Sequence, residues 1–455
     1  MTKRPLRVAA AGVSTERSVP ALDVGQIRGD FPILKRRING KPLIYLDNSA
    51  TTQMPEPVLQ VMIEQLHNSE SNVHRGIHTL SEESTQRMEQ AREQMRRFLG
   101  AAHPEEIIFT SGTTGAINLL ARAMSFGLLR PGDEVVTTQM EHHANLIPWQ
   151  QACARTGASL KVVPIDSHGD LDMDAFAQAL SARTKLVAAA WVSNVTGAVN
   201  PMEKIISMAH RAGAWVLVDG AQAVRHAPMD VQKLDCDFFA LSGHKMMGPT
   251  GTGVLYGKRR LLEQLPPDSF GGGMVDRVTQ YEATFAGLPY RLEAGTPNIV
   301  GNIGLGAAAA YLMNLGAEEI ALREGALCRF LSERLAGCKG VRFVGMPKMR
   351  AGCVSFNIEG THCYDAAKLL DQLGIAVRSG HHCAQPLLAA LDLTGAVRVS
   401  PAFYNTMEEA EAFVRAVDRV SRVCAPKDRA ILRHRSGKTA RTAERCSDNG
   451  ADGRK

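Results

Sequence analysis

Three features are missing from this sequence of 455 residues: a long apolar run, a Cys-x-x-Cys pair and an internal repeat. A helix that crosses a bilayer needs about 18 or more consecutive apolar residues, so the missing run predicts a chain that does not span a membrane. The nine cysteines are scattered and odd in number. That argues against a disulfide framework or a zinc cluster and favours a reducing compartment. We therefore expect a cytoplasmic protein with no metal site.

A large excess of positive charge is missing as well. The formal net charge is +6, but nine basic and four acidic residues lie between positions 427 and 455. The other 426 residues therefore carry about +1, too little to attract nucleic acid in general. Residues 426–455 are also poor in large apolar side chains, and residues 1–22 hold no continuous apolar core. We expect both ends of the chain to be disordered.

What the sequence does contain is a regular alternation of short apolar strands with helices. Strands are predicted at residues 106–110, 134–138, 160–164, 186–191 and 215–218. This order predicts an α/β fold, with a mostly parallel sheet and helices on both of its faces. The length suits two domains. We predict a large domain over residues 23–317 and a smaller α+β domain over residues 318–425.

Two of the apolar strands end in residues that can do chemistry. Residues 215–218 lead into Asp219, and residues 236–241 lead into Ser242, His244 and Lys245. In parallel sheets ligands bind beyond the carboxyl ends of the strands. Pyridoxal phosphate (PLP) needs a lysine for a Schiff base and a carboxylate that keeps the ring nitrogen protonated. A helix-capping aspartate beside a solvated lysine is the alternative interpretation.

Other polar groups are predicted at the same edge of the sheet. His142 and Asn194 also follow strands, and the strand-to-helix turn at residues 111–118 exposes backbone N–H groups that can cradle a phosphate. Serine and threonine also cap helices of every kind. A second chemical stretch, residues 376–386, holds Cys383 beside two histidines. A thiol in that setting is a candidate nucleophile, although most buried cysteines are inert.

Together these stretches resemble the Suf-type (group II) cysteine desulfurases, PLP enzymes of the class V aminotransferase group with the type I PLP-dependent transferase fold. The motifs are Gln-Met-Glu-His-His-Ala-Asn at 139–145, Asp-Gly-Ala-Gln at 219–222, Ser-Gly-His-Lys at 242–245 and Arg-Ser-Gly-His-His-Cys at 378–383. The similarity runs from about residue 23 to about residue 423. One departure is Gly115, where relatives commonly carry glutamate.

The resemblance implies conversion of L-cysteine to L-alanine, with the sulfur left on the enzyme as a persulfide and supplied to iron–sulfur cluster assembly. It also implies a homodimer and a sulfur-acceptor protein, of the SufE type or a zinc-containing equivalent. The alternatives are a selenocysteine lyase, a transaminase or a β-lyase on the same scaffold, because PLP chemistries share scaffolds. A non-enzymatic scaffold in sulfur or iron–sulfur assembly is a third possibility. We expect neither nucleic acid nor a membrane as a partner.

The same resemblance gives each site residue a role. Lys245 would carry the cofactor, His142 would stack on its ring and act as acid and base, and Cys383 would be the nucleophile. Asn194, Arg378 and Arg398 would bind the substrate, with Arg398 gripping the carboxylate. The cofactor-binding residues would be His142, Lys245, Thr113, Thr114, Asn194, Asp219, Gln222, Ser242, His244 and, from the neighbouring subunit, Thr296.

Overall fold

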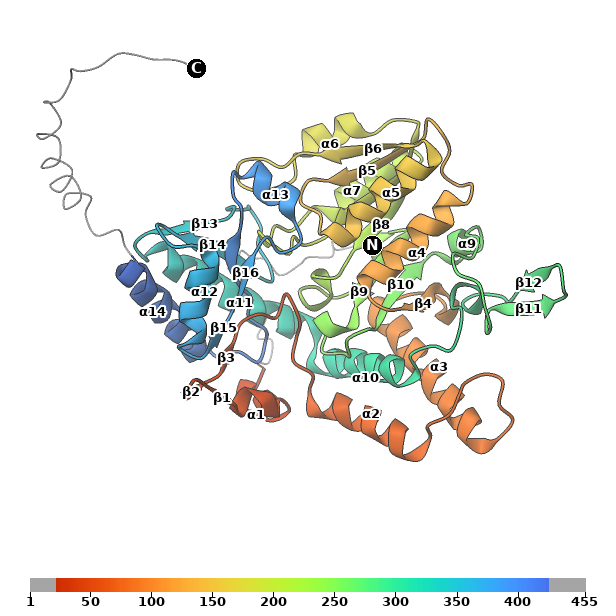
Figure 1. Cartoon of the computed structure of the whole chain (residues 1–455), viewed down its shortest axis with the longest axis horizontal. Coiled ribbons are helices and arrows are strands. Elements are labelled where there is room, and N and C mark those ends of the chain that lie inside the picture. The colour runs from red at the N-terminus through yellow and green to blue at the C-terminus, as the bar shows by residue number, and fades with distance from the viewer. Residues whose placement is uncertain (1–21, 425–455) are drawn as a thin grey trace, which may run out of the picture.

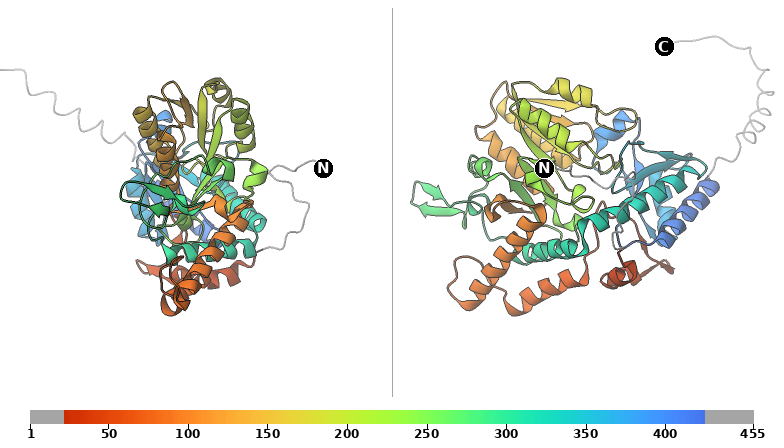
Figure 2. Two further views of the ribbon diagram at one scale, coloured as in Figure 1. Left: turned by 90° about the vertical axis from the view of Figure 1, so that its right-hand side faces the viewer. Right: turned by 180° about the vertical axis from the view of Figure 1, so that it is seen from behind.

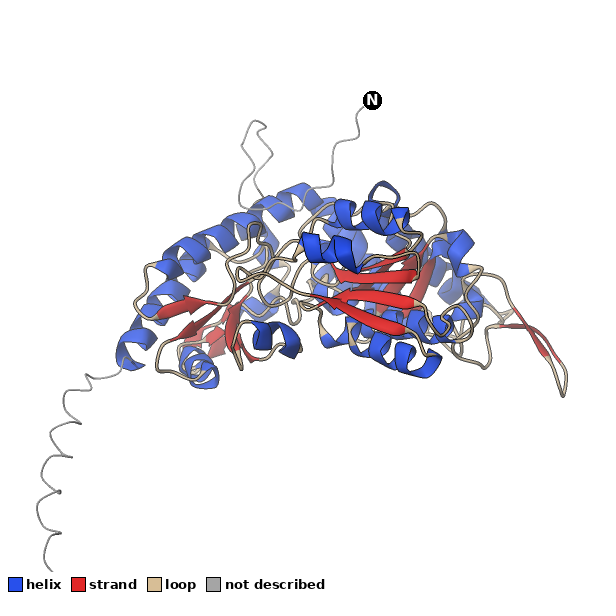
Figure 3. Cartoon of the chain, turned by 90° about the horizontal axis from the view of Figure 1, so that it is seen from above, coloured by secondary structure: helices blue, strands red, loops and turns tan. Residues whose placement is uncertain are grey.

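The structure is a computed structural model that describes residues 22–424 (Figure 1). The N-terminal extension before residue 22 and the basic tail after residue 424, both expected to be disordered, lie outside the described residues. The described chain forms a larger and a smaller unit, each built around its own sheet (Figures 1 and 3).

The larger unit contains a seven-stranded sheet in the order β4-β10-β9-β8-β7-β5-β6. Neighbours from β9 to β6 in that order are parallel, and β10 is antiparallel to both strands beside it. β8 is the middle strand, and its sequence is apolar up to Asp219 because a strand covered on both faces is apolar throughout. The strands are β4 (Ile107–Thr110), β5 (Glu134–Thr138), β6 (Ser159–Val163), β7 (Thr184–Ala190), β8 (Trp215–Asp219), β9 (Phe238–Ser242) and β10 (Gly253–Gly257).

Helices cover both faces of this sheet (Figure 3). Successive strand residues point to opposite faces, so Val216 and Val218 join one apolar cluster and Leu217 joins the other. The cluster around Leu217 includes residues of α4 and α5, and the first cluster includes residues of α3 and α7. The helices are α2 (Glu56–Asn68), α3 (Thr79–Leu99), α4 (Thr113–Ser125), α5 (Ile147–Thr156), α6 (Met173–Ala179), α7 (Met202–Arg211), α8 (Val231–Leu234), α9 (Arg259–Leu262) and α10 (Ile299–Leu315).

The smaller unit is a four-stranded antiparallel sheet in the order β13-β14-β17-β16, with helices packed on it. Its own apolar cluster joins Phe356 of β14, Val397 of β17 and Phe413 of α14. The elements are α11 (Ala317–Ala336), β13 (Val341–Phe343), β14 (Val354–Ile358), α12 (Cys363–Asp371), β16 (Arg378–Gly380), α13 (Gln385–Ala390), β17 (Ala396–Val399) and α14 (Met407–Cys424).

The first described residues lie against the smaller unit, although they come from the other end of the chain (Figure 1). β3 (Ile44–Tyr45) pairs in parallel with β15 (Ile375–Ala376), and Asp47 forms a parallel bridge to Ser400. Residues 23–47 were predicted to belong to the large domain, but β3 and Asp47 pair with the smaller unit. The other elements of this segment are α1 (Val24–Gly29), β1 (Arg37–Ile38) and β2 (Lys41–Pro42).

A β-hairpin extends away from the larger unit, formed by β11 (Val275–Val278) and β12 (Ala283–Phe285) (Figures 1 and 2). Neither strand of this hairpin was among those predicted from the sequence. Among residues 22–424 no single helix is long and apolar enough to cross a membrane. α10 and α11 meet the length and composition criteria only as a pair, which is bent by 80° at the break between them.

Candidate active site

A cavity of about 210 Å³ lies where strands of the large sheet end, and residues of the smaller unit close it. Every predicted site residue except Thr296 lines this cavity. Thr296 lines a different cavity, beside Ser111 and Gly115. The residues that meet in the first cavity are Thr113, Thr114, His142, Asn194, Asp219, Gln222, Ser242, His244, Lys245, Arg378, Cys383 and Arg398.

Asp219 and Lys245 both line the cavity, and each affects the pKa of the other. Asp219 is the last residue of β8 and 5% exposed, and its Oδ1 accepts the N–H of Ala221 at 2.9 Å. Burial raises the pKa of Asp219, and the charge of Lys245 opposes the rise. Burial lowers the pKa of Lys245, and Asp219 opposes that shift in turn. An amine that loses its proton more easily is a better nucleophile toward an aldehyde.

The turn between β4 and α4 forms a cradle at the same cavity. Gly112 has φ +130°, and a Cβ atom there would lie 3.2 Å from Oγ of Ser242. The missing side chain lets that hydroxyl accept the N–H of Thr113 at 2.8 Å, and it also lies 2.8 Å from Oγ1 of Thr113. Thr113 begins α4, a helix of 13 residues, so the cradle combines hydroxyl groups with the positive end of a helix dipole.

His142 precedes the short turn η3 (His143–Asn145) that follows β5. Its Nδ1 accepts the N–H of Ala144 at 3.1 Å, so a neutral ring carries its proton on Nε2. Burial, and then the charge of Lys245, lower the pKa of His142 to about 3. The ring is therefore neutral near pH 7, with Nδ1 occupied by the bond from Ala144.

The segment that follows β3 contributes to the cavity, which the sequence did not predict. Ser49 and Ala50 line it, and the carbonyl oxygen of Ser49 accepts the amide N–H of Gln222 at 2.8 Å. Thr51 Oγ1 lies 3.3 Å from Nδ1 of His244. A local sequence signal was present, because polar or small residues follow the apolar residues 43–46. Nothing in the local pattern showed that this strand joins the far end of the chain.

Cys383 sits on a tight turn between β16 and α13. Gly380, His382 and Cys383 have φ values of +115°, +51° and +54°. The carbonyl oxygen of Cys383 accepts the N–H of His143 at 2.7 Å, so the turn is fixed to the segment of His142. Cys383 is half-buried, whereas the six free cysteines between positions 153 and 363 are buried. A reactive thiol must be accessible, and the structure sets Cys383 apart in that respect.

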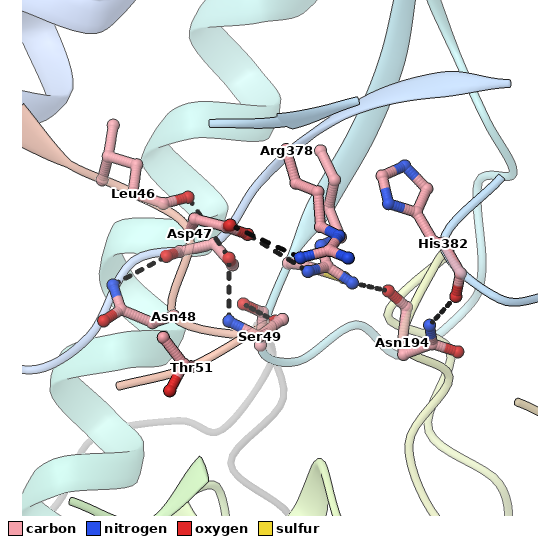
Figure 4. A network of polar contacts seen from close by, with 12 residues as sticks. Leu46, Asp47, Asn48, Ser49, Thr51, Asn194, Arg378 and His382 are labelled. Atoms are coloured by element: carbon pink, nitrogen blue, oxygen red, sulfur yellow. Dashed lines mark hydrogen bonds and ion pairs between the residues drawn. The ribbon is translucent and has the colours of Figure 1, made fainter. Parts of the chain in front are cut away.

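Two arginines from the smaller unit complete the cavity. Arg398 on β17 is 2% exposed, and its Nη1 donates to the carbonyl oxygen of Asn194 at 2.8 Å. Its Nη2 donates to Oδ1 of Asp47 at 3.2 Å, and Arg378 on β16 lies 4.0 Å from Oδ2 of the same carboxylate. Figure 4 shows Asp47 reaching toward Arg378. No function was predicted for Asp47 from the sequence.

These features fit PLP. A buried carboxylate and a partly buried amine face one cavity, and neither forms an ion pair within 4.0 Å to any residue between 22 and 424. The hydroxyl cradle at Thr113 and Ser242 is the kind of site that holds a phosphate. Among residues 22–424 no group of three or more histidine, cysteine, aspartate or glutamate side chains could hold a metal ion.

Comparison with known proteins places the chain in a family. Residues 44–413 match the model of the aminotransferase class-V family. The chain is 48% identical to the probable cysteine desulfurase of Halalkalibacterium halodurans, over 88% of this chain and 98% of that protein. It is 45% identical to a cysteine desulfurase of Escherichia coli, over 88% and 98% of the two chains. This chain belongs to the cysteine desulfurases of the class-V aminotransferase family.

Longer family members and solved structures agree with this assignment. The probable cysteine desulfurase 1 of Mycobacterium leprae is 48% identical, and the match covers 66% of its length. The E. coli cysteine desulfurase CsdA has a TM-score of 0.81 at 39% identity, over 88% of this chain and 99% of that chain. The apo cysteine desulfurase of Thermococcus onnurineus has a TM-score of 0.84 at 37% identity, over 90% of this chain and 100% of that chain. The predicted fold class is confirmed, and the family is PLP-dependent.

Proposed function

We propose that this chain is a PLP-dependent cysteine desulfurase of the Suf type. It converts L-cysteine to L-alanine and keeps the sulfur as a persulfide on Cys383. The observation that carries the proposal is that a half-buried cysteine, a buried arginine and the Asp219–Lys245 pair line one cavity of about 210 Å³. A transaminase needs the arginine, the aspartate and the lysine but has no use for the thiol.

PLP would be held by Lys245, with Asp219 at its ring nitrogen, Gln222 and Asn194 near its ring oxygen, and Thr113, Thr114, Ser242 and His244 at its phosphate. When bound there, it supplies an electron sink for bonds broken at the carbons of the substrate. Arg398 binds the α-carboxylate of L-cysteine through a guanidinium that Asn194 and Asp47 hold in place. His142 would stack on the cofactor ring and act as acid and base near the substrate amine, once its Nδ1 is released from the N–H of Ala144.

The thiolate of Cys383 then attacks the sulfur of the substrate. A bond forms between Sγ of Cys383 and that sulfur as the bond from the sulfur to Cβ of the substrate breaks. The electron pair of the broken bond stays with the carbon fragment, which takes up a proton and leaves as L-alanine. The outer sulfur of the persulfide is the atom that a second thiolate can attack.

We further propose that the sulfur passes to an acceptor protein, of the SufE type or a zinc-containing equivalent, and on to iron–sulfur cluster assembly in the cytoplasm. The turn that carries Cys383 supports this, because its carbonyl bond to His143 limits the reach of the thiol. A homodimer is part of the proposal. The position of Thr296 outside the first cavity leaves that residue available to the cofactor of a neighbouring subunit.

The test is mass spectrometry of the protein after exposure to L-cysteine, with L-alanine measured in parallel. Wild-type protein should gain one sulfur atom on the peptide that contains Cys383. Cys383→Ser should bind L-cysteine but gain no sulfur and release no L-alanine. Cys338→Ser, a change at a buried cysteine of the smaller unit, should behave as wild type. Release of L-alanine by Cys383→Ser at the wild-type rate would overturn the proposal.

The alternative function, a selenocysteine lyase, is distinguished by its products and by its preference between L-selenocysteine and L-cysteine. With L-selenocysteine it gives L-alanine and selenide, and it acts poorly on L-cysteine. Comparable kcat/KM values for the two substrates, with persulfide on Cys383, support the desulfurase. A keto acid as the product would identify a transaminase or a β-lyase.

A further inference from the structure

Arg378 and Arg398 lie directly opposite each other on neighbouring strands. They are register partners in the antiparallel pair of β16 and β17, so their side chains leave the sheet on the same face. Like charges in directly opposed positions destabilise a sheet. Both residues also line the cavity that Lys245 lines. The arrangement requires a counter-charge.

Asp47 supplies that counter-charge. Its Oδ1 accepts from Nη2 of Arg398 at 3.2 Å, and its Oδ2 lies 4.0 Å from Nη1 of Arg378. Within residues 22–424 no other carboxylate lies within 4.0 Å of either guanidinium. The backbone bridge from Asp47 to Ser400, two residues after Arg398, fixes the carboxylate beside β17.

The two arginines differ in how firmly they are held. Arg398 is buried, and both Asn194 and Asp47 accept hydrogen bonds from it. The side chain of Arg378 is 48% exposed, and Asp47 is its one ion-pair partner in the described part of the chain. Arg378 stands five positions before Cys383, and both line the cavity. A freed Arg378 would therefore be available to an anionic group near the thiol.

We propose that Asp47 is a specificity-determining residue, which reduces the charge of the Arg378–Arg398 pair from two to one. The site then matches an amino acid with one carboxylate and no second anionic group. This inference rests on the proposed function, because it assumes that an α-amino acid binds with its carboxylate at Arg398. Asp47 itself contacts the two arginines and does not line the cavity.

The experiment measures binding of L-alanine and L-aspartate to the PLP-loaded enzyme by absorbance titration. L-Alanine is the product, and L-aspartate adds a carboxylate near the thiol. In Asp47→Asn the ratio of the L-aspartate Kd to the L-alanine Kd should fall by about tenfold, because Arg378 loses its counter-charge. Asp47→Glu keeps the charge and should keep the wild-type ratio. A change in stability alone leaves this ratio unchanged.

A double variant tests whether the gain depends on Arg378. Asp47→Asn combined with Arg378→Ala should lose the improved binding of L-aspartate. If Asp47→Asn does not fold, Arg378→Ala alone tests the inference. This variant lowers the net charge of Asp47, Arg378 and Arg398 from one to zero, so it should weaken the binding of L-alanine. An unchanged Kd ratio in Asp47→Asn, or unchanged L-alanine binding in Arg378→Ala, overturns the inference. Failure of the wild type to bind L-alanine would overturn the proposed function itself.

Discussion

The side-chain amide of Asn194 donates a 2.8 Å hydrogen bond to the carbonyl oxygen of His382, the residue before Cys383. Asn194 follows β7 in the larger unit, so this bond fixes the cysteine turn of the smaller unit across the cavity (Figure 4). The carbonyl oxygen of Asn194 also accepts from Arg398. One residue thus positions both the thiol and the substrate-binding guanidinium.

We expect Asn194→Ala to slow persulfide formation on Cys383 by tenfold or more, because a lost buried hydrogen bond costs about 1–3 kcal/mol. The backbone carbonyl that holds Arg398 remains, so binding of L-alanine should change less. Single-turnover formation of the persulfide and titration with L-alanine separate the two effects. Asn357→Ala removes a similar amide-to-carbonyl bond of 2.9 Å outside the cavity, and persulfide formation should remain normal.

Replacing Lys245 should remove covalent attachment of the cofactor. We expect Lys245→Ala to lose the absorbance that PLP linked to a lysine gives, and borohydride should fix no PLP to the protein. Lys258→Ala is the control, since Lys258 forms ion pairs with Asp235 and Asp237 away from the cavity. A reducible PLP adduct on another lysine of Lys245→Ala would show that the assignment is wrong.

Arg398→Ala should lower kcat/KM for L-cysteine mainly through KM. A charged hydrogen bond is worth about 2 kcal/mol, which corresponds to about 30-fold. Arg398→Lys should recover only part of the loss, because an ammonium group lacks the planar fork that grips a carboxylate. Arg342→Ala is the control at an exposed arginine of the smaller unit, paired with Glu359 at 2.7 Å. Equal KM values for Arg398→Ala and wild type would assign the carboxylate to another cation.

Much of this site could be predicted from the sequence, because several of its residues directly follow apolar strands. Residues 215–218 are apolar and then end in a charged residue, and a parallel sheet brings such ends to one edge. The positions of Asp219, Lys245, His142 and Asn194 follow from that rule. The structure places all four on one cavity. The motif around Cys383 added the thiol, and the structure places this half-buried cysteine on a turn at the cavity.

The role of Asp47 could not be predicted, because it depends on contacts between distant parts of the chain. β3 and β15 are two residues long each, and they pair although about 330 positions separate them. Strands this short carry no periodic pattern that would reveal a partner.

β10 was also missed from the sequence. Its antiparallel pairing with β4 and β9 inserts one strand into an otherwise parallel order.

His382 should make the protein less stable in mild acid. Its Nε2 lies 3.0 Å from the carbonyl oxygen of Ala396, and burial, followed by the charge of Arg398, lowers its pKa to about 3 from 6.5. Between these values the unfolded chain binds one proton more than the folded chain. The stability that His382 contributes is therefore complete above pH 6.5 and declines as the pH falls toward 3.

We expect the melting temperature of His382→Gln to depend less steeply on pH than that of wild type between pH 6.5 and pH 4. Titrating groups that both proteins retain contribute equally to the two pH dependences, so the difference between the curves reports on His382. His67→Gln removes an exposed histidine of α2 and should leave the wild-type slope. Parallel curves for His382→Gln and wild type would mean that another group sets the acid sensitivity.

Gly112 and Gly127 offer a matched pair for testing the phosphate cradle. Both have a strongly positive φ, +130° and +122°, so an alanine at either position costs backbone strain. A Cβ at 127 meets no atom within 4 Å, whereas a Cβ at 112 lies 3.2 Å from Oγ of Ser242. We therefore expect both variants to lose stability, but only Gly112→Ala to shift the hydroxyl that bonds to Thr113. The Kd for PLP, measured by absorbance titration of the apoprotein, should rise at least tenfold in Gly112→Ala and stay near the wild-type value in Gly127→Ala. If the two variants bind PLP equally well, the turn at Gly112 does not hold the phosphate.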